Sequence, residues 1–289
     1  LMEEFYTIQG EGFHKGTAAY FVRIGGCDVG CHWCDVKESW NAKLHPPTST
    51  DIMVENASKN ANTVVVTGGE PFLHKQFLNL IVRLADSELA GQISLEIFTN
   101  CTWYPAKLEL NALMKFKHIQ LSPSIDGVGS TNDLLRYPSK WEKIEATLDK
   151  WIELRDATGR LNIATATTVS VINAPQLHEF IHWARVHKGI GVILQTVYEP
   201  HYMSVEHWPD WYKQTLDMIV EQQFSGFNKN AGKFKTAYKL LKKLCKSHSK
   251  KDNSIMYKTE LKHVLTHRGQ DISMAPKFKN ILEYHDKQG

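Results

Sequence analysis

The chain has 289 residues, of which 42% are hydrophobic and 22% charged, and its formal net charge is +3. These values are ordinary for a globular protein and allow one large or two small domains with a sizeable core. No stretch is long and apolar enough to span a membrane, and no signal peptide is visible, so we expect a cytoplasmic protein without a membrane partner.

The charge is unevenly distributed along the chain. Residues 229–289 hold fifteen Lys and Arg against five Asp and Glu, a net charge of +10, which leaves −7 for the rest. A basic end can bind phosphate-rich partners. A solvated helical face is the simpler explanation, so we do not expect nucleic acid as the partner.

The first predicted elements surround a group of cysteines. Residues 5–17 contain a polar turn flanked by glycines, and residues 18–26 have the pattern of a buried strand ending in two glycines. Three cysteines follow this strand. A helix is predicted from residue 50 to about residue 60, because Ser49, Thr50 and Asp51 are good caps.

From residue 63, strands and helices alternate. Strands are predicted at 63–67, 93–99, 118–122, 161–171 and 191–197, and helices at 77–89, 108–114, 141–154 and 176–186. With 18–26 this makes six strands, and repeated β–α units imply a parallel sheet. The predicted fold class is therefore α/β, a partial (β/α)6 TIM-like barrel that is open on one side to admit a substrate.

The pattern changes beyond residue 200. Helices are predicted at 208–224 and 231–245, whereas residues 247–289 are Lys- and His-rich, weakly patterned and expected to be partly mobile. The predicted domains are an α/β core over 1–200 and a basic, mainly helical C-terminal extension over 201–289.

Cys27, Cys31 and Cys34 lie in one loop just after the first predicted strand, at the end of a strand where α/β folds build sites. Three close cysteinates can bind three irons of a 4Fe–4S cluster and leave the fourth iron open to another ligand. Zinc is an alternative, with His32 as a poorly placed fourth ligand. A disulfide is another, but it would suit a secreted protein.

A second metal-binding pattern lies on the helix predicted at 176–186. His178 and His182 form a His-Glu-x-x-His sequence, the signature of zinc peptidases, and one helical turn separates them. The apolar stripe of this helix lies between them, and no convincing third ligand follows. Surface histidines on an amphipathic helix are the favoured interpretation.

Two motifs together resemble a known superfamily. Trp33 stands directly before the last of the three cysteines, and Gly68-Gly69-Glu70-Pro71 follows the second predicted strand. In this order, the cysteine loop and the turn resemble the radical S-adenosylmethionine (SAM) superfamily. The resemblance implies a 4Fe–4S cluster held by the three cysteines, with SAM bound at the open iron. An electron from the cluster cleaves SAM, and the 5′-deoxyadenosyl radical abstracts hydrogen from the substrate.

The same resemblance implies a SAM site. Glycines let the backbone approach the methionine part, Glu70 or nearby carbonyls accept from its ammonium, and Trp33 contacts the adenine. Asp126 would orient the SAM ribose or the substrate, unless it only caps a turn. The residues expected at this site are Trp33, Gly68, Gly69, Glu70, Thr99, Asn100, Ser122 and Asp126.

The N-terminal quarter resembles a narrower family. Residues 5–14 (FYTIQGEGFH), 21–23 (FVR) and 31–35 (CHWCD) closely resemble 7-carboxy-7-deazaguanine synthase, and the likeness runs from about Glu3 to Pro71. These lyases contract the ring of 6-carboxy-5,6,7,8-tetrahydropterin on the route to queuosine and other deazapurines. The resemblance therefore predicts this activity, with a small-molecule pterin as substrate.

The resemblance also names substrate-binding residues. Gln9, Glu11 and Gly12 would contact the pterin, Arg23 would pair with its carboxylate, and Thr67 would lie beside it. Without the family, 9–12 is an ordinary turn and Arg23 a solvated charge at a strand end.

One departure from that family concerns magnesium. A Thr after the Cys-Asp pair often binds Mg²⁺ there, but here Val36, which has no oxygen ligand, takes its place. Magnesium is expected only if Asp35 or a substrate carboxylate supplies the ligand.

From about Glu70 onward, the chain resembles radical SAM proteins with a reduced auxiliary, or twitch, domain. This likeness is carried by Thr99-Asn100, residues 124–129, Arg136, Trp141 and the helix predicted after residues 171–173. A twitch-type enzyme that modifies a peptide or another small molecule is therefore the alternative function. Several such proteins hold a second cluster, but Cys245 alone cannot, so one cluster is predicted.

Two further hypotheses place the chain in other functional classes. A zinc hydrolase would use the histidine pair, and a non-catalytic basic module would keep the cluster as a structural element. The radical SAM resemblance implies a flavodoxin- or ferredoxin-type reductant as partner and a homodimer as the assembly to test.

Overall fold

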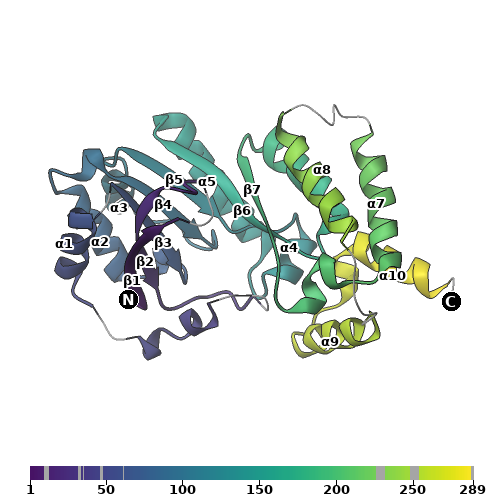
Figure 1. Ribbon diagram of the computed structural model, residues 1–289. Helices are drawn as coiled ribbons and strands as arrows, with labels where there is room; N and C mark the ends of the chain where they lie inside the picture. The colour runs from purple at the N-terminus through teal and green to yellow at the C-terminus, as the bar shows by residue number, and fades with distance from the viewer. Residues whose placement is uncertain are drawn as a thin grey trace. The chain divides into compact units, whose positions relative to one another are not determined.

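The computed structural model describes residues 1–9, 13–31, 34, 36–45, 48–60, 62–225, 232–247 and 254–287 (Figure 1). The strands are β1 Glu3–Ile8, β2 Ala18–Ile24, β3 Thr63–Gly68, β4 Ser94–Thr99, β5 His118–Pro123, β6 Leu161–Val169 and β7 Gly191–Thr196. The α-helices are α1 Thr50–Asn60, α2 Lys75–Ala85, α3 Lys107–Leu113, α4 Ser130–Leu135, α5 Trp141–Thr158, α6 Leu177–His182, α7 Asp210–Phe224, α8 Gly232–Cys245, α9 Ser254–His267 and α10 Pro276–Asp286.

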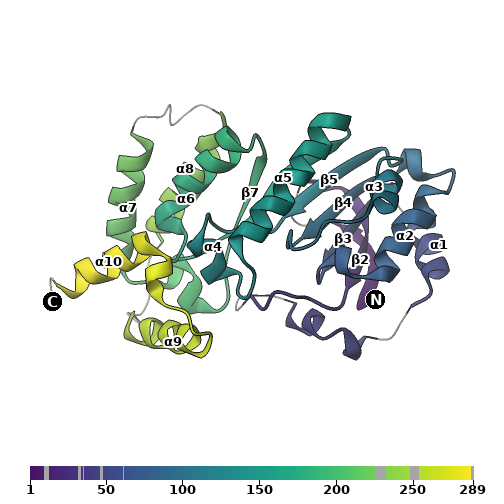
Figure 2. The same ribbon diagram turned by 180° about the vertical axis from the view of Figure 1, so that it is seen from behind.

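The strands form a sheet in sequence order, β1 to β7. β1 is antiparallel to β2, whereas β2 to β6 pair in parallel, each joined to the next by a helical crossover. Figures 1 and 2 show α1, α2 and α3 against one face of this sheet. Repeated β–α units with parallel strands of this kind build a partial TIM-like barrel, so the predicted fold class is confirmed.

Contacts divide the chain into two compact units, which are described separately. The first comprises Leu1–Gly30, Val36–Ser124 and Pro138–Ala166, and the second Cys31–Asp35, Ile125–Tyr137 and Thr167–Gly289. The boundary predicted at residue 200 remains a prediction.

The core of the first unit lies between the sheet and its helices. Along β2 to β5 alternate residues share a face, and those facing the helices are almost fully buried, as Val22, Val66, Ile97 and Leu121 are. Burying each such side chain contributes roughly 1.5–3 kcal/mol. The opposite face of the same strands holds polar side chains, which the next subsection describes.

The second unit has its own apolar core. α7 and α8 lie side by side (Figure 1), and Trp208, Tyr212, Phe224 and Phe278 are fully buried. The Tyr212 hydroxyl donates to the Val171 carbonyl at 2.6 Å. The buried hydroxyl of this tyrosine therefore has a hydrogen-bond partner. The helices beyond residue 200 are thus packed elements.

The predicted strands and helices are present with boundary shifts of a few residues, but β1, α9 and α10 were not predicted. The polar turn predicted within residues 5–17 lies mostly outside the described residues, and the strand that precedes it, Glu3–Ile8, was missed. α9 and α10 lie within the weakly patterned segment 247–289, and Phe278 and Ile281 of α10 are buried; the partial mobility expected of this segment remains a prediction. Among the described helices, none has the length and apolar character needed to cross a membrane.

Candidate active site

Three parallel strands of the first unit end at the same edge of the sheet. β2 leads into Gly25-Gly26-Cys27, β3 into Gly69-Glu70, and β4 into Asn100. The first two ends are bonded together, because the Gly69 N–H donates to the Ile24 carbonyl at 2.7 Å and the Glu70 N–H to the Gly26 carbonyl at 3.1 Å. The turn predicted for SAM therefore lies against the start of the cysteine loop.

This close approach requires glycine. A Cβ at Gly69 would lie 1.8 Å from the Gly26 oxygen, and a Cβ at Gly68 would lie 2.3 Å from the Ile24 oxygen. Gly68 also has φ of +104°, which L side chains rarely adopt. The two glycines of the predicted SAM turn are thus explained by backbone packing in the protein itself.

Glu70 shapes this turn from a fully buried position. Its carboxylate accepts from the Thr99 hydroxyl at 2.8 Å, from the Asn100 N–H at 2.6 Å and from the Phe72 N–H at 3.3 Å. Burial raises the pKa of Glu70 to about 7, although these hydrogen bonds act in the opposite direction. Both carboxylate oxygens are engaged, and contact with the SAM ammonium remains a prediction.

The raised pKa of Glu70 predicts a pH-dependent stability. Its value is 4.5 when unperturbed and about 7 in the fold, so the folded state holds the proton more tightly. The resulting stabilisation is complete below pH 4.5 and is lost as the pH rises through 7, about 3 kcal/mol in all. The free energy of unfolding of the cluster-free protein should therefore fall, relative to Glu70→Gln, between pH 5 and 8 in urea titrations. A difference that is constant over this range would refute the assignment.

None of the three cysteines forms a disulfide. In the first unit, Cys27 Sγ accepts from Asn100 Nδ2 at 3.3 Å. In the second unit, the Cys34 N–H donates to the Cys31 carbonyl at 3.1 Å, and Arg136 Nη1 lies 3.8 Å from Cys31 Sγ. Soft thiolates that receive N–H donors are the ligand set that iron–sulfur clusters use. The residues fit the cluster chemically, and the mutual arrangement of the three sulfurs remains a prediction.

Asp126 is buried in the second unit. Its Oδ1 accepts from the Thr168 N–H at 2.7 Å, and its Oδ2 pairs with Arg136 Nε at 2.8 Å. Its own N–H and carbonyl are bonded to Asn132 Oδ1 and Asn173 Nδ2. Asp126 thus holds Arg136, which reaches Cys31, while its predicted role toward the SAM ribose or the substrate stays a prediction.

The inner face of the sheet carries a buried polar layer that the sequence analysis missed. Glu96 of β4 is fully buried; its carboxylate accepts from Gln9 Nε2 at 2.9 Å, from Ser122 Oγ at 3.2 Å and from the Phe13 N–H at 3.3 Å. Gln120 of β5, also fully buried, donates to Ser122 Oγ at 3.5 Å. A lone charged residue between the apolar residues Leu95 and Ile97 of the strand Ser94–Thr99 is the signal that could have identified Glu96.

Arg23 and Thr67 are neighbours on the same face, because they are register partners in β2 and β3. Arg23 forms an ion pair with Glu3, its partner across β1, and its guanidinium lies 5.5 Å from the Phe5 ring centroid. Among the described atoms, Arg23 Nε is buried and has no hydrogen-bond partner. Its donor capacity is therefore only partly used.

Three predicted site residues, Glu11, Gly12 and Trp33, lie outside the described residues, as does Asp35, the remaining candidate for magnesium.

The histidine pair on α6 is half-buried, and the ring of His178 packs against Phe224 and Phe234. Within the described ranges, no group of three or more His, Cys, Asp or Glu side chains is arranged to hold a metal ion, so the pair has no third ligand there.

The comparison with protein families agrees with this geometry. The model "Radical SAM superfamily" matches residues 21–184, more than half of the chain, and the chain belongs to this superfamily of enzymes. Its curated relatives are named more narrowly. It is 84% identical over 71 residues to a 7-carboxy-7-deazaguanine synthase of Flavobacterium psychrophilum, covering 25% of this chain and 34% of that protein.

A more divergent relative is covered at greater length. The chain is 31% identical over 182 residues to a 7-carboxy-7-deazaguanine synthase of Hyperthermus butylicus, covering 63% of this chain and 75% of that protein. The chain spans about a third of the length of the first curated relatives it matches. Among solved structures, Streptococcus suis SuiB has a TM-score of 0.52 at 16% identity, covering 73% of this chain and 47% of that chain. At this identity only the fold is shared.

Proposed function

We propose that the chain is a radical SAM enzyme that contracts the ring of 6-carboxy-5,6,7,8-tetrahydropterin to 7-carboxy-7-deazaguanine. The observation that carries this proposal is the buried polar layer around Glu96, which lies on the inner face of the sheet beside Arg23 and Thr67. The names of the curated relatives support it. The structural neighbours share the fold alone and give no support to a twitch-type activity.

In this proposal Cys27, Cys31 and Cys34 hold one 4Fe–4S cluster, and the Gly68–Glu70 turn binds the methionine part of SAM. When bound, the two cofactors supply a 5′-deoxyadenosyl radical that removes a hydrogen atom from the substrate. Asn100, which already donates to Cys27 Sγ, connects the SAM turn to the cysteine loop. Thr99 holds the Glu70 carboxylate and so fixes the turn. Trp33 would contact the adenine of SAM, Asp126 would orient the SAM ribose or the substrate, and Ser122 would lie at the same site.

On the substrate side, each pterin group finds a suitable partner. The pterin edge offers N–H donors and ring acceptors, which suit the Glu96 carboxylate and the Gln9 amide, and Glu11 and Gly12 would follow on the same turn. The pterin carboxylate suits Arg23, whose Nε is buried and unbonded within the described structure. Thr67, next to Arg23 in register, would line the same site.

The reaction needs an external electron at low potential, so we also propose a flavodoxin- or ferredoxin-type reductant and a cytoplasmic, reducing environment. Magnesium would require Asp35 or the substrate carboxylate as ligand, because Val36 offers no side-chain oxygen. Whether the active protein is a homodimer is tested by its mass in solution.

The proposal is tested by one assay. Reconstituted, reduced protein is mixed with SAM and the carboxytetrahydropterin, and the products are analysed by mass spectrometry. We expect 7-carboxy-7-deazaguanine and ammonia, because contraction of the pterin ring removes one ring nitrogen. The substrate equals these two products without net oxidation or reduction, so the abstracted hydrogen atom must be returned, SAM is regenerated, and 5′-deoxyadenosine should appear only from turnovers that end before product forms. SAM cleavage without the deazaguanine acid would contradict the proposed substrate but not the enzyme class.

Arg23→Ala should separate substrate binding from cluster binding. Loss of a charge-assisted, two-point contact should weaken binding of the carboxytetrahydropterin by roughly 30- to 100-fold while the iron content stays unchanged. Arg83→Ala is the matched control, since Arg83 forms an exposed ion pair with Asp51 on the outer helices. Calorimetric titration of both variants with the carboxytetrahydropterin measures this affinity. An unchanged affinity in Arg23→Ala would show that Arg23 does not bind the substrate.

A further inference from the structure

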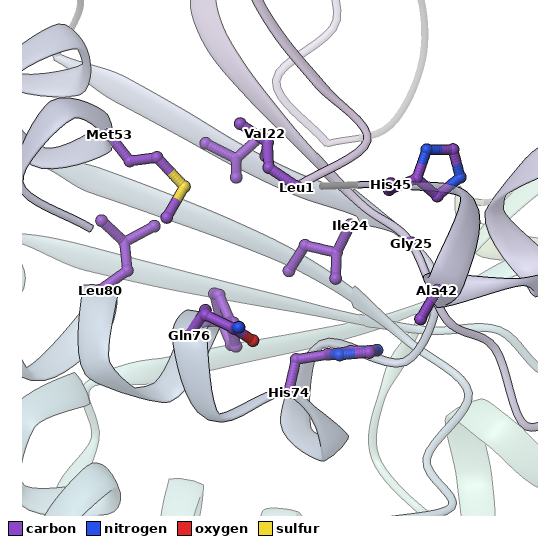
Figure 3. A pocket seen from close by; sticks show the side chains of 11 residues that line it. Leu1, Val22, Ile24, Gly25, Ala42, His45, Met53, His74, Gln76 and Leu80 are labelled. Carbon is purple, nitrogen blue, oxygen red and sulfur yellow. The ribbon is translucent and has the colours of Figure 1, made fainter. Parts of the chain in front are cut away.

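A cavity of about 160 Å³ lies on the helix-facing side of β2, against α1 and α2 (Figure 3). Apolar side chains such as Val22, Ile24 and Leu80 form its walls, and two imidazoles, those of His45 and His74, line its other end. Neither imidazole belongs to the site described above. What each ring contacts decides what it can do.

His74 bonds to the start of the cysteine loop. It directly precedes α2, and its Nε2 lies 2.9 Å from the Gly26 carbonyl oxygen. A carbonyl oxygen only accepts, so Nε2 carries the proton in this contact. The ring also packs on the backbone, because a Cβ at Gly26 would lie 2.5 Å from His74 Cε1. The same Gly26 oxygen accepts the Glu70 N–H at 3.1 Å.

The Gly26 carbonyl oxygen, which accepts both hydrogen bonds, belongs to the peptide that joins Gly26 to Cys27. Two donors on one oxygen fix the plane of this peptide, and with it the direction in which Cys27 leaves the strand. The Cys27 sulfur is held separately, by Asn100 Nδ2 at 3.3 Å. The first cysteine of the loop is therefore held at its backbone by His74 and Glu70 and at its sulfur by Asn100.

We propose that His74 is a positioning residue, which locks the Gly26–Cys27 peptide against the Gly68–Glu70 turn. It acts through Gly26 and keeps the first proposed cluster ligand in register with the turn proposed to bind SAM. This role goes beyond the proposed ring contraction, because it concerns the cysteine loop and the SAM turn and does not depend on which substrate the enzyme takes.

The first test removes the donor and keeps the ring. His74→Phe should weaken SAM binding to the reconstituted protein about fivefold, the value of one lost hydrogen bond. In the cluster-free protein, the backbone amides of residues 25–30 should exchange hydrogen faster than in the unsubstituted chain. His74→Gln, which keeps an N–H donor on a side chain of similar reach, should bind SAM more tightly than His74→Phe.

The second test uses the cavity. His74→Ala leaves a space that adjoins the existing cavity, and added imidazole should enter it, donate to Gly26 and restore SAM affinity to within about twofold. His45→Ala is the matched control, since its ring lines the same cavity but bonds to the Glu38 carbonyl at 2.8 Å. SAM affinity of His45→Ala should be unchanged and insensitive to imidazole.

Two results would overturn the inference. One is SAM affinity and amide exchange in His74→Phe equal to those of the unsubstituted protein. The other is a weakened His74→Ala that imidazole does not restore, since a general loss of packing would then explain the defect. Failure of the unsubstituted protein to bind SAM would instead contradict the proposed function, and the exchange measurement would still decide the role of His74.

Discussion

Cys31→Ser should lose the cluster and all SAM cleavage. A cluster held by three thiolates has no spare ligand, and serine is a hard oxygen donor that binds iron poorly in this setting. Cys31 is buried, and Arg136 lies 3.8 Å from its sulfur, so the substitution also removes the acceptor of that contact. We expect the brown colour, the bound iron and 5′-deoxyadenosine formation all to fall to background.

Cys245→Ser is the matched control for this experiment. Burial, with Asp217 nearby, raises the pKa of the Cys245 thiol to about 12, so it stays protonated and is a poor ligand. This variant should keep its iron and its SAM cleavage. An iron content in Cys31→Ser equal to that of Cys245→Ser would show that Cys31 is not a ligand, and the assignment of the cysteine loop would fail.

Gly69→Ala should lower the stability of the protein strongly, although it adds only one methyl group. The new Cβ would lie 1.8 Å from the Gly26 oxygen and 2.5 Å from its carbonyl carbon, and both are backbone atoms that cannot turn aside. The two strand ends must separate, which costs about 2 kcal/mol or more and lowers the melting temperature by roughly 4–8 °C. SAM binding should also be lost, since the turn and the cysteine loop no longer pack.

Gly91→Ala makes the same substitution where nothing lies within 4 Å of the added Cβ. Its melting temperature should stay within about 1 °C of the unsubstituted chain. Thermal unfolding of the two variants side by side separates a general effect of alanine from the contact at Gly26. A Gly69→Ala protein that melts and binds SAM normally would mean that the two strand ends are not packed as described.

The sequence predicted the alternating strands and helices because their apolar residues repeat with clear periods. It failed at β1, where Tyr6 and Ile8 are exposed on an edge strand and no regular alternation of buried residues marks it. The helix α9 also has a weak pattern and was not predicted, although Leu261 and Leu265 are buried. Edge strands and short terminal helices depend on contacts that only the fold supplies.

The cysteine loop and the glycine turn could be predicted because their residues are close in the sequence. The hydrogen bonds of Glu96 could not be predicted, even though its charge stands out within a strand, because its partners, Gln9 and Ser122, come from other strands and loops. His74 was missed for a similar reason: its bond to Gly26 spans 48 positions, and nothing in the local pattern distinguishes it from an ordinary residue before a helix. Glu70 was predicted to contact SAM, whereas its carboxylate also fixes Thr99 and Asn100.

The central claim is a single iron–sulfur cube bound through three cysteines, with its fourth iron open to SAM. Iron and sulfide analysis of the anaerobically reconstituted protein, followed by electron paramagnetic resonance of the reduced cluster with and without SAM, tests it most directly. We predict about four irons and four sulfides per chain and a resonance spectrum that changes when SAM is added. Zinc in place of iron, or a spectrum indifferent to SAM, would contradict the account.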